Sequence, residues 1–243
     1  MRPVLLRVGG FALRAYPTLL YFGLLSGVAA GQYVARQSEV DPVRVSVATV
    51  FLAAAALLGA RLLFVALHWD VYRREPLRIW RRSEGGAALY GGLVLPLILS
   101  VPLLRALDLP FGAFWDLATV TILVGMIPTR LGCFLNGCCA GRPSQGPLAL
   151  YLPGRLGRWE RRIPVQLLEA AWAAVLLAAT AAWWSRRPFD GSVFLAAIGG
   201  YGIGRFVLES LRETVDRIGP FSVNRAISLA LVAASLLVFF LRS

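Results

Sequence analysis

The sequence predicts an all-α, polytopic membrane protein with about seven transmembrane helices around a polar, arginine-lined site. Two observations predict the helices. Hydrophobic residues make up 58% of the 243 residues, whereas a soluble domain has roughly 45–50%, and the mean hydropathy is +0.67. A third observation predicts the site, because arginines lie inside apolar runs and ionisable residues at membrane depth are functional candidates.

Seven apolar runs approach the length of about 20 residues that a transmembrane helix needs. Little chain remains outside them, so we expect residues 1–243 to form one integral membrane domain. The first run lacks the short apolar core and the small-residue cleavage site of a secretory signal, so we interpret it as a retained span. The predicted spans are 14–35, 44–68, 87–107, 111–135, 164–185, 189–210 and 221–241.

Two connections between these spans have distinctive compositions. Residues 69–86 interleave aromatic residues with arginine, which is typical of an arm that lies in the membrane interface. Residues 142–162 are rich in Pro, Gly and Arg, and we expect a polar loop that faces a substrate. The pairs Gly85-Gly86 and Gly91-Gly92 at the start of the third span predict a close backbone approach or a bend.

The charge pattern favours a lipid partner over nucleic acid. The formal net charge is +12, and all 25 basic residues are arginines. These arginines flank apolar spans, where anionic headgroups are the natural counter-charge. Anchoring of the protein in the membrane suffices to explain most of the surface arginines.

A few arginines need a more specific explanation. Arg61, Arg130 and Arg205 lie in or at the edge of apolar spans. An unpaired arginine at the centre of a span costs about 2.5–3.5 kcal/mol on insertion scales, so these residues need partners or a position near the interface. The acids considered as partners are Asp116, Glu169 and Glu209.

The sixth span carries a polar stripe. Arg205 and Glu209 are four residues apart and share one helix face, with Tyr201 one turn before them and Arg212 one turn after. The stripe is either a structural salt bridge with charged ends that reach the interface or an anion site between helices. We favour the anion site, because Arg130 adds a second guanidinium and two guanidiniums can clamp one phosphate.

Three cysteines follow Arg130 within a glycine-rich segment. Their odd number argues against a disulfide framework. A zinc site usually has four N or S ligands, and the only histidine, His68, is distant in sequence, so we expect no metal. Cys133 is either a nucleophile stabilised by Arg130 or a small side chain packed between helices, and we favour packing. For His68 we likewise favour an interfacial position over a role as a base.

The chain resembles the prolipoprotein diacylglyceryl transferases over nearly its whole length. The family pattern Gly-Arg-x-Gly-Asn-Phe-x-Asn-Gly-Glu-x-x-Gly-Arg corresponds to Thr129-Arg130-Leu131-Gly132-Cys133-Phe134-Leu135-Asn136-Gly137-Cys138-Cys139-Ala140-Gly141-Arg142. The pattern Tyr-Gly-x-x-Arg-Phe-x-x-Glu-x-x-Arg is intact from Tyr201 to Arg212. Further matches in family order are Gly59-Ala60-Arg61, Glu84-Gly85-Gly86, Tyr90-Gly91-Gly92, Pro164, Gln166 and Glu169.

This resemblance implies an activity and a location. Members of the family move a diacylglyceryl group from phosphatidylglycerol to the thiol of the lipobox cysteine in the signal peptide of a preprolipoprotein, and glycerol phosphate leaves. No cofactor or metal is needed. The resemblance also implies a multi-pass protein of the bacterial plasma membrane.

The resemblance also implies residue roles. Arg130 and Arg205 would bind the phosphate and stabilise the leaving group, and Glu209 would orient Arg205. Tyr90 would stand at the catalytic position that is a histidine in the family. The residues implied in substrate binding or pocket shape are Tyr16, Arg61, Gly91, Gly92, Asn136, Gly137, Gly141, Arg142, Gln166, Glu169, Tyr201 and Arg212.

Several residues depart from the family pattern. Tyr90 replaces the histidine, and tyrosine, with a reference pKa near 10, is a poor base at neutral pH. Cys133 and Cys138 replace an Asn and a Glu, and the Arg-Glu-Pro-Asp ending reads Arg212-Glu213-Thr214-Val215-Asp216. Two alternatives therefore stay open: a related transferase with another acceptor, and a non-catalytic lipid-binding or transport protein.

The orientation in the membrane receives two opposite predictions. Most arginines lie on the side of the N-terminus, which the positive-inside rule assigns to the cytoplasm. The family resemblance implies an N-terminus outside and a C-terminus inside. We favour the orientation of the family, because arginine-rich arms at the outer leaflet can serve a lipid substrate.

Overall fold

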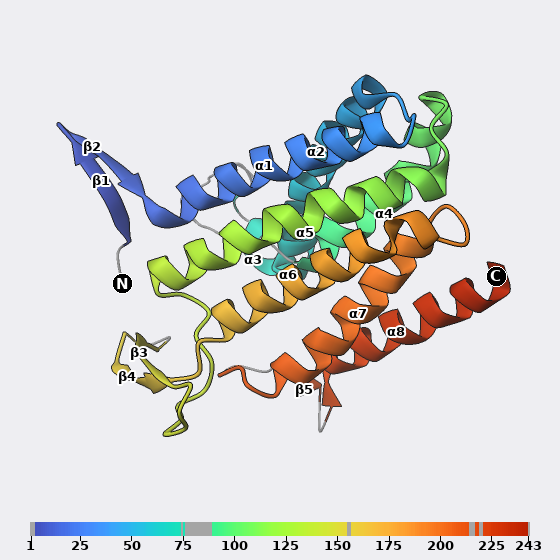
Figure 1. The fold of residues 1–243 in the computed structure, drawn as a ribbon. Helices are drawn as coiled ribbons and strands as arrows, with labels where there is room; N and C mark the ends of the chain where they lie inside the picture. Colours follow the sequence, from blue (N-terminus) through green and yellow to red (C-terminus); the bar gives the residue numbers. More distant parts are fainter. Residues whose placement is uncertain are drawn as a thin grey trace. The chain divides into compact units, whose positions relative to one another are not determined.

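A computed structural model of the chain describes residues 3–73, 75, 89–154, 157–213, 217–218 and 221–242 (Figure 1). The helices are α1 (Ala15–Gln37), α2 (Pro42–Leu67), α3 (Trp69–Tyr72), α4 (Leu89–Ala106), α5 (Phe111–Asn136), α6 (Val165–Trp183), α7 (Ser192–Glu209) and α8 (Val223–Arg242), with a 3-10 turn at Trp184–Arg186 after α6. The strands pair as antiparallel hairpins: β1 (Val4–Val8) with β2 (Phe11–Arg14), β3 (Leu150–Pro153) with β4 (Trp159–Arg162), and β5 (Arg217–Ile218) with β6 (Phe221–Ser222).

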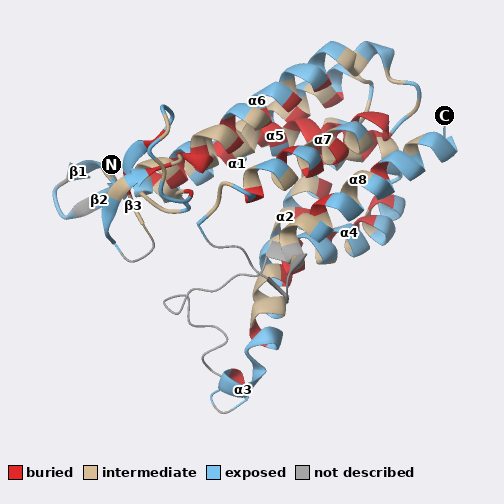
Figure 2. Ribbon diagram, turned by 90° about the horizontal axis from the view of Figure 1, so that it is seen from below, coloured by how far each residue is buried: buried red, intermediate tan, exposed pale blue. Residues whose placement is uncertain are grey.

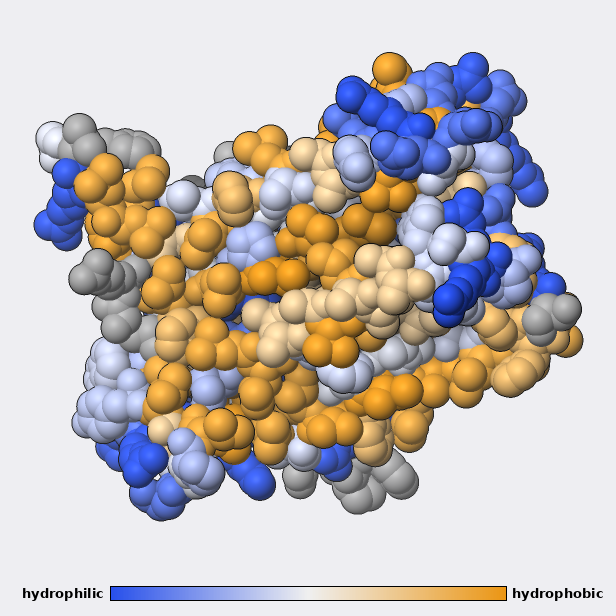
Figure 3. Space-filling view, in the orientation of Figure 1, coloured by the Kyte–Doolittle hydropathy of each residue, from blue (hydrophilic) through white to orange (hydrophobic). Residues whose placement is uncertain are grey.

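The predicted polytopic all-α architecture is confirmed. Six of the described helices are long and apolar enough to cross a membrane: α1, α2, α5, α6, α7 and α8. The third predicted span corresponds to α4, whose apolar part, Gly91–Ala106, is shorter. Apolar side chains line the outward faces of the helices (Figure 3). Such extensive apolar exposure is unusual for a monomeric soluble protein and suits a surface in contact with lipid.

The two predicted connections have different outcomes. The polar loop over 142–162 contains the β3–β4 hairpin, so part of it is regular structure that its Pro- and Gly-rich composition did not predict. The interfacial arm over 69–86 begins with α3, but residues 74 and 76–88 lie outside the described residues. Its interfacial position therefore stays a prediction.

The chain divides into two compact units, one made of Met1–Val34 with Trp115–Ser243 and the other of Ala35–Phe114. In the first unit, buried residues concentrate on α5, α6 and α7 (Figure 2). In the apolar stretches of α6 and α7, 39% of the residues are buried, whereas in that of α8 only 11% are buried. Helix α7 packs against both α6 and α8, and the buried residues of α5, α6 and α7 form the interior of this unit.

In the second unit, α2 and α4 approach each other at two facing glycines. A Cβ atom on Gly59 would lie 2.2 Å from the carbonyl oxygen of Gly91, and one on Gly91 would lie 2.1 Å from that of Gly59. A side chain at either position would force the helices apart, because the two backbones are in contact. The close approach predicted for the Gly91-Gly92 pair is therefore confirmed.

Asp116, one of the acids considered as an arginine partner, has a different role. Its side chain is almost fully buried in α5 and accepts hydrogen bonds of 2.8 Å each from the backbone nitrogens of Gly191 and Phe194. These nitrogens lie at the start of α7, where the helix dipole favours a negative charge. Asp116 therefore caps α7 from α5.

Candidate functional site

A carboxylate on α6 forms the centre of the arginine cluster. Glu169 is 3.0 Å from Nη1 of Arg130, 2.8 Å from Nη1 of Arg205 and 3.1 Å from Nη1 of Arg212. These arginines come from α5, from α7 and from the segment after α7, and the side chain of Glu169 is only 8% exposed. The fold thus places three sequence-predicted arginines on one buried acid.

The predicted pair on α7 is also present. Nη2 of Arg205 lies 3.0 Å from Oε2 of Glu209, which is completely buried. Nδ2 of Asn224, at the start of α8, donates to Oε1 of Glu209 at 2.8 Å. Sequence reasoning did not assign Asn224 to the site, because an amide at the start of a helix has no motif that reveals a distant partner.

The charges of this cluster do not balance. Arg130, Arg205 and Arg212 carry three positive charges, whereas Glu169 and Glu209 carry two negative charges. The surplus of one positive charge lies among largely buried side chains, where electrostatic interactions are stronger than in water. The cluster can therefore attract an anion as well as hold the helices together.

A pocket opens beside these charges. Arg130, Arg205, Glu169 and Tyr201 border it, its apolar wall contains Met126, Trp172 and Leu208, and the surface that faces the pocket is apolar. Trp172 is fixed by a hydrogen bond of 3.1 Å from its indole nitrogen to the carbonyl oxygen of Gly200. The pocket is small, so a molecule with an anionic and an apolar part would have to displace the side chains that line it.

Arg212 is held near the pocket by backbone bonds among three segments. Gly141, after α5, forms a bridge with Arg212, and its nitrogen donates to the carbonyl oxygen of Ile163 at 2.8 Å. The backbone nitrogen of Arg142 donates to the carbonyl oxygen of Leu211 at 2.9 Å. The chain before α6 and the chain after α7 are therefore both tied to the chain after α5.

A buried arginine that sequence reasoning missed reinforces this junction. The side chain of Arg162 donates to the carbonyl oxygen of Gly141 at 3.1 Å, pairs with Glu213 at 2.9 Å, and contacts Glu160. Burial opposes its charge, but the hydrogen bonds to Glu213 and Glu160 raise the pKa of Arg162. Arg162 is therefore charged and fixes the base of the predicted loop over 142–162.

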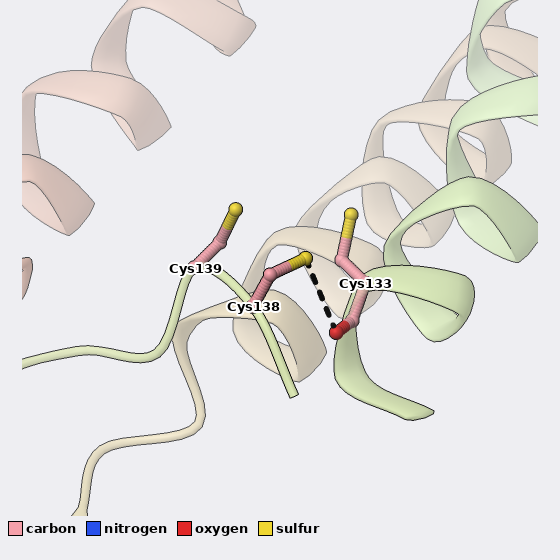
Figure 4. Close-up of side chains that lie close together, drawn as sticks. All are labelled: Cys133, Cys138 and Cys139. Atoms are coloured by element: carbon pink, nitrogen blue, oxygen red, sulfur yellow. Dashed lines mark hydrogen bonds between the residues drawn. The ribbon is translucent and has the colours of Figure 1, made fainter. Parts of the chain in front are cut away.

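Helix α5 ends in a turn that brings two cysteines together. Gly137 has a φ of +77°, and the backbone nitrogen of Cys138 donates to the carbonyl oxygen of Cys133 at 3.1 Å. A left-handed glycine with this six-to-one hydrogen bond is typical of a helix C-terminus. The thiol of Cys138 then lies 3.6 Å from the carbonyl oxygen of Cys133 (Figure 4).

All three sulfur atoms lie within 4.8 Å of one another. Cys133 is buried, Cys138 is half-buried and Cys139 is exposed. Hydrogen bonds from the thiols of Cys133 and Cys138, together with the positive charges of Arg212 and Arg130, lower the pKa of Cys139 despite its burial penalty. Packing explains the position of Cys133, but not the gathering of three thiols beside the arginine cluster.

Other predicted site residues surround the end of α5. Gln166 is fully buried in α6 and donates from Nε2 to the carbonyl oxygen of Cys138 at 2.5 Å. Tyr16, on α1, lies beside α5, where a Cβ atom on Gly132 would be 3.4 Å from the Cα atom of Tyr16. The side chains of Asn136 and Arg142 are exposed. Gly141 is enclosed, because a Cβ atom there would lie 2.5 Å from the carbonyl oxygen of Leu211.

The remaining predicted residues belong to the second unit. The guanidinium carbon of Arg61 lies 5.8 and 5.6 Å from the ring centres of Phe64 and Tyr72. Gly91 and Gly92 lie in α4, where Gly91 serves helix packing. The side chain of Tyr90 lies outside the described residues. Participation of these residues in the site stays a prediction.

Comparison with known proteins identifies relatives along the whole chain. The sequence model of the family described as prolipoprotein diacylglyceryl transferase matches residues 3–241. Three relatives, each named phosphatidylglycerol–prolipoprotein diacylglyceryl transferase, are similar to this chain. The protein of a Nostoc species is 28% identical over 96% of this chain and 87% of its own length. The protein of Gloeobacter violaceus is 29% identical over 94% and 88%, and that of Clostridium botulinum is 27% identical over 94% and 92%.

Proposed function

Because the chain belongs to the prolipoprotein diacylglyceryl transferase family, we propose that it transfers the diacylglyceryl group of phosphatidylglycerol to the lipobox cysteine thiol of preprolipoproteins. The proposal includes the bacterial plasma membrane as the location of this multi-pass protein, with the N-terminus outside. The relatives named above support the two substrates. The geometry of the arginine cluster supports the chemistry.

The observation that carries the proposal is the buried surplus of positive charge. Arg130 and Arg205 are 23% and 14% exposed, and both line the pocket. The headgroup of phosphatidylglycerol has one phosphodiester and is attached to two acyl chains. The phosphate would bind the guanidiniums, and the apolar wall with Met126 and Leu208 would receive the start of an acyl chain.

The reaction also requires positive charge near the leaving group. The acceptor sulfur attacks a glycerol carbon, the carbon–oxygen bond breaks, and its electron pair goes to the oxygen of the departing glycerol phosphate. Negative charge on the phosphate increases during this step. Preorganised donors directed at developing charge are usually the largest contribution to catalysis, and we assign this role to Arg130 and Arg205.

The carboxylates would position these arginines. A guanidinium has five N–H donors, so the bonds of Arg205 to Glu169 and Glu209 leave donors for a phosphate. Glu209 itself is anchored by Asn224. We therefore assign Glu169 and Glu209 to the orientation of the guanidiniums, with Arg212 as a further source of positive charge.

A transfer assay with purified protein in detergent tests the proposal. The substrates are phosphatidylglycerol labelled in the diacylglyceryl group and a peptide with a lipobox cysteine. We expect label on the peptide and release of glycerol phosphate. Arg130→Ala should abolish transfer, whereas Arg36→Ala, at an exposed arginine in the last turn of α1, should not change it.

The assay also separates the two alternatives. Transfer to another thiol or hydroxyl compound, but not to the lipobox peptide, would identify a transferase with a different acceptor. Saturable phosphatidylglycerol binding by a folded protein that modifies no acceptor would identify a lipid-binding or transport protein. Either result would overturn the proposed function.

A further inference from the structure

We propose that Cys133, Cys138 and Cys139 form a three-sulfur site for a thiophilic metal ion, Zn²⁺ by chemical preference, with a fourth position open to the acceptor thiol. The identity of that fourth ligand rests on the proposed function. The metal site itself rests only on the geometry of the three cysteines.

The distances suit one shared ion. The three sulfur atoms lie within 4.8 Å of one another. Zinc–sulfur bonds are about 2.3 Å long, so sulfurs around one zinc ion lie roughly 4 Å apart. Small rotations of the side chains would therefore complete the site without a change of the backbone. Figure 4 shows the sulfur of Cys138 between those of Cys133 and Cys139 in this view.

The backbone holds the three cysteines in this arrangement. The turn at Gly137 brings Cys138 back to the last turn of α5 that carries Cys133. The fully buried side chain of Gln166 binds the carbonyl oxygen of Cys138. Cys139 has a φ of +64°, in the left-handed region. A non-glycine residue is strained in this region, and such strain concentrates at functional sites.

The number of ligands suits a catalytic site rather than a structural one. Structural zinc sites use four protein ligands, whereas catalytic zinc sites use three and keep the fourth position for water or substrate. The expectation from the sequence that no metal is bound considered only the structural type of zinc site, with four protein ligands. Among the described residues, the group of His, Cys, Asp and Glu side chains that could share an ion here consists of these three cysteines, which leaves a fourth position open.

The open position offers a route to the nucleophile that needs no histidine base. A bound ion would favour the deprotonated form of a thiol in this position, with the proton passing to water. The thiolate sulfur would then attack the glycerol carbon as the carbon–oxygen bond breaks, and glycerol phosphate would leave with the electron pair as a phosphate monoester, with no change of oxidation state.

Metal analysis of the purified full-length protein tests the first half of the inference. The protein is prepared in detergent without chelator, its metal content is measured by mass spectrometry, and its site is titrated with Co²⁺, whose bonds to thiolate give an ultraviolet charge-transfer band. We expect about one metal ion per chain. Zinc or copper in the preparation identifies which thiophilic ion is held.

Three variants identify the ligands. Cys133→Ser, Cys138→Ser and Cys139→Ser should each weaken metal binding. The loss of affinity should exceed the roughly 10–100-fold that follows removal of a residue that only hydrogen-bonds to a metal ligand. Size-exclusion behaviour and phosphatidylglycerol binding show whether each variant is folded. A folded wild-type protein that binds no metal, with free thiols or with a disulfide among the three cysteines, would overturn the inference.

A peptide titration of the Co²⁺-loaded protein tests the open position. A lipobox peptide should shift the charge-transfer band, and the same peptide with serine for cysteine should not. The absence of a shift would overturn the open position.

Arg130→Ala should keep the metal and the shift but lose transfer. A wild-type protein that shows the shift without any transfer would refute the proposed function and leave the metal site with its open position intact.

Discussion

Two arginines in apolar helices, Arg205 in the first unit and Arg61 in the second, have different environments. Arg205 is 14% exposed and pairs with Glu169 and Glu209. Arg61 lies in α2, where its guanidinium approaches the rings of Phe64 and Tyr72. Acids thus surround the guanidinium of Arg205, and aromatic faces lie beside the guanidinium of Arg61.

The packing of the helices differs in the same way. In the second unit, α2 and α4 meet backbone to backbone at Gly59 and Gly91, where no polar side chain intervenes. In the first unit, charged groups of α5, α6 and α7 meet around Glu169. The second unit thus uses close backbone packing at this contact, whereas the first joins three helices through a buried polar cluster.

The largest expected effect follows from the removal of the central acid. Glu169→Ala leaves three guanidiniums with one carboxylate, and breaking a buried ion pair in this way costs about 3–5 kcal/mol. We expect a loss of that size in the free energy of unfolding, measured by chemical denaturation in mixed micelles, together with loss of transfer. The matched control in the second unit is Asp70→Asn, in the exposed pair with Arg73. Equal stability of the two variants would contradict the distinction between the units.

The next effect concerns catalysis rather than folding. Arg205→Gln removes a donor for developing charge, and the loss of one such donor lowers kcat by about 10²–10³. The transfer assay with labelled phosphatidylglycerol measures kcat. The control is Arg44→Gln, at an arginine of α2 with a half-exposed side chain. A kcat unchanged by Arg205→Gln would remove this arginine from the proposed leaving-group role.

A smaller effect is expected at the glycine contact of the second unit. Gly59→Ala inserts a methyl group 2.2 Å from the carbonyl oxygen of Gly91, so α2 and α4 must separate. Overpacking of this kind costs about 1–3 kcal/mol, visible as a lower midpoint of unfolding. The control, Gly10→Ala, meets open space, because no atom lies within 4 Å of the new Cβ. If Gly59→Ala left the midpoint of unfolding unchanged, α2 and α4 would accommodate the added methyl group without a loss of stability.

The smallest effect is expected at the exposed ion pair of Asp70 and Arg73. Asp70→Asn in α3 removes an ion pair of 3.1 Å whose side chains are 87% and 53% exposed. Such pairs contribute about 0–1 kcal/mol. We expect no resolvable change in thermal unfolding. A large destabilisation there would show that charge is as important to the second unit as to the first.

Local pattern was sufficient to predict the helices. Each predicted span corresponds to a described helix, because the apolar runs end at charged or turn residues and a span must satisfy its own backbone hydrogen bonds. The pair of Arg205 and Glu209 was likewise predictable, since residues four apart share a helix face. The hairpin of β3 and β4 was not, because no run of alternating residues distinguishes it.

The sequence by itself determined the apolar helices, the surplus of arginine and, by resemblance, the family. Only the tertiary structure decided which acid holds which arginine: it placed Glu169 among three guanidiniums, used Asp116 as the cap of α7, and gathered three sulfur atoms at the end of α5. The physical reason is range. Hydrophobic periodicity and turns act between near neighbours in the chain, whereas ion pairs and shared ligands depend on which helix faces meet, and that is set by packing of the whole unit.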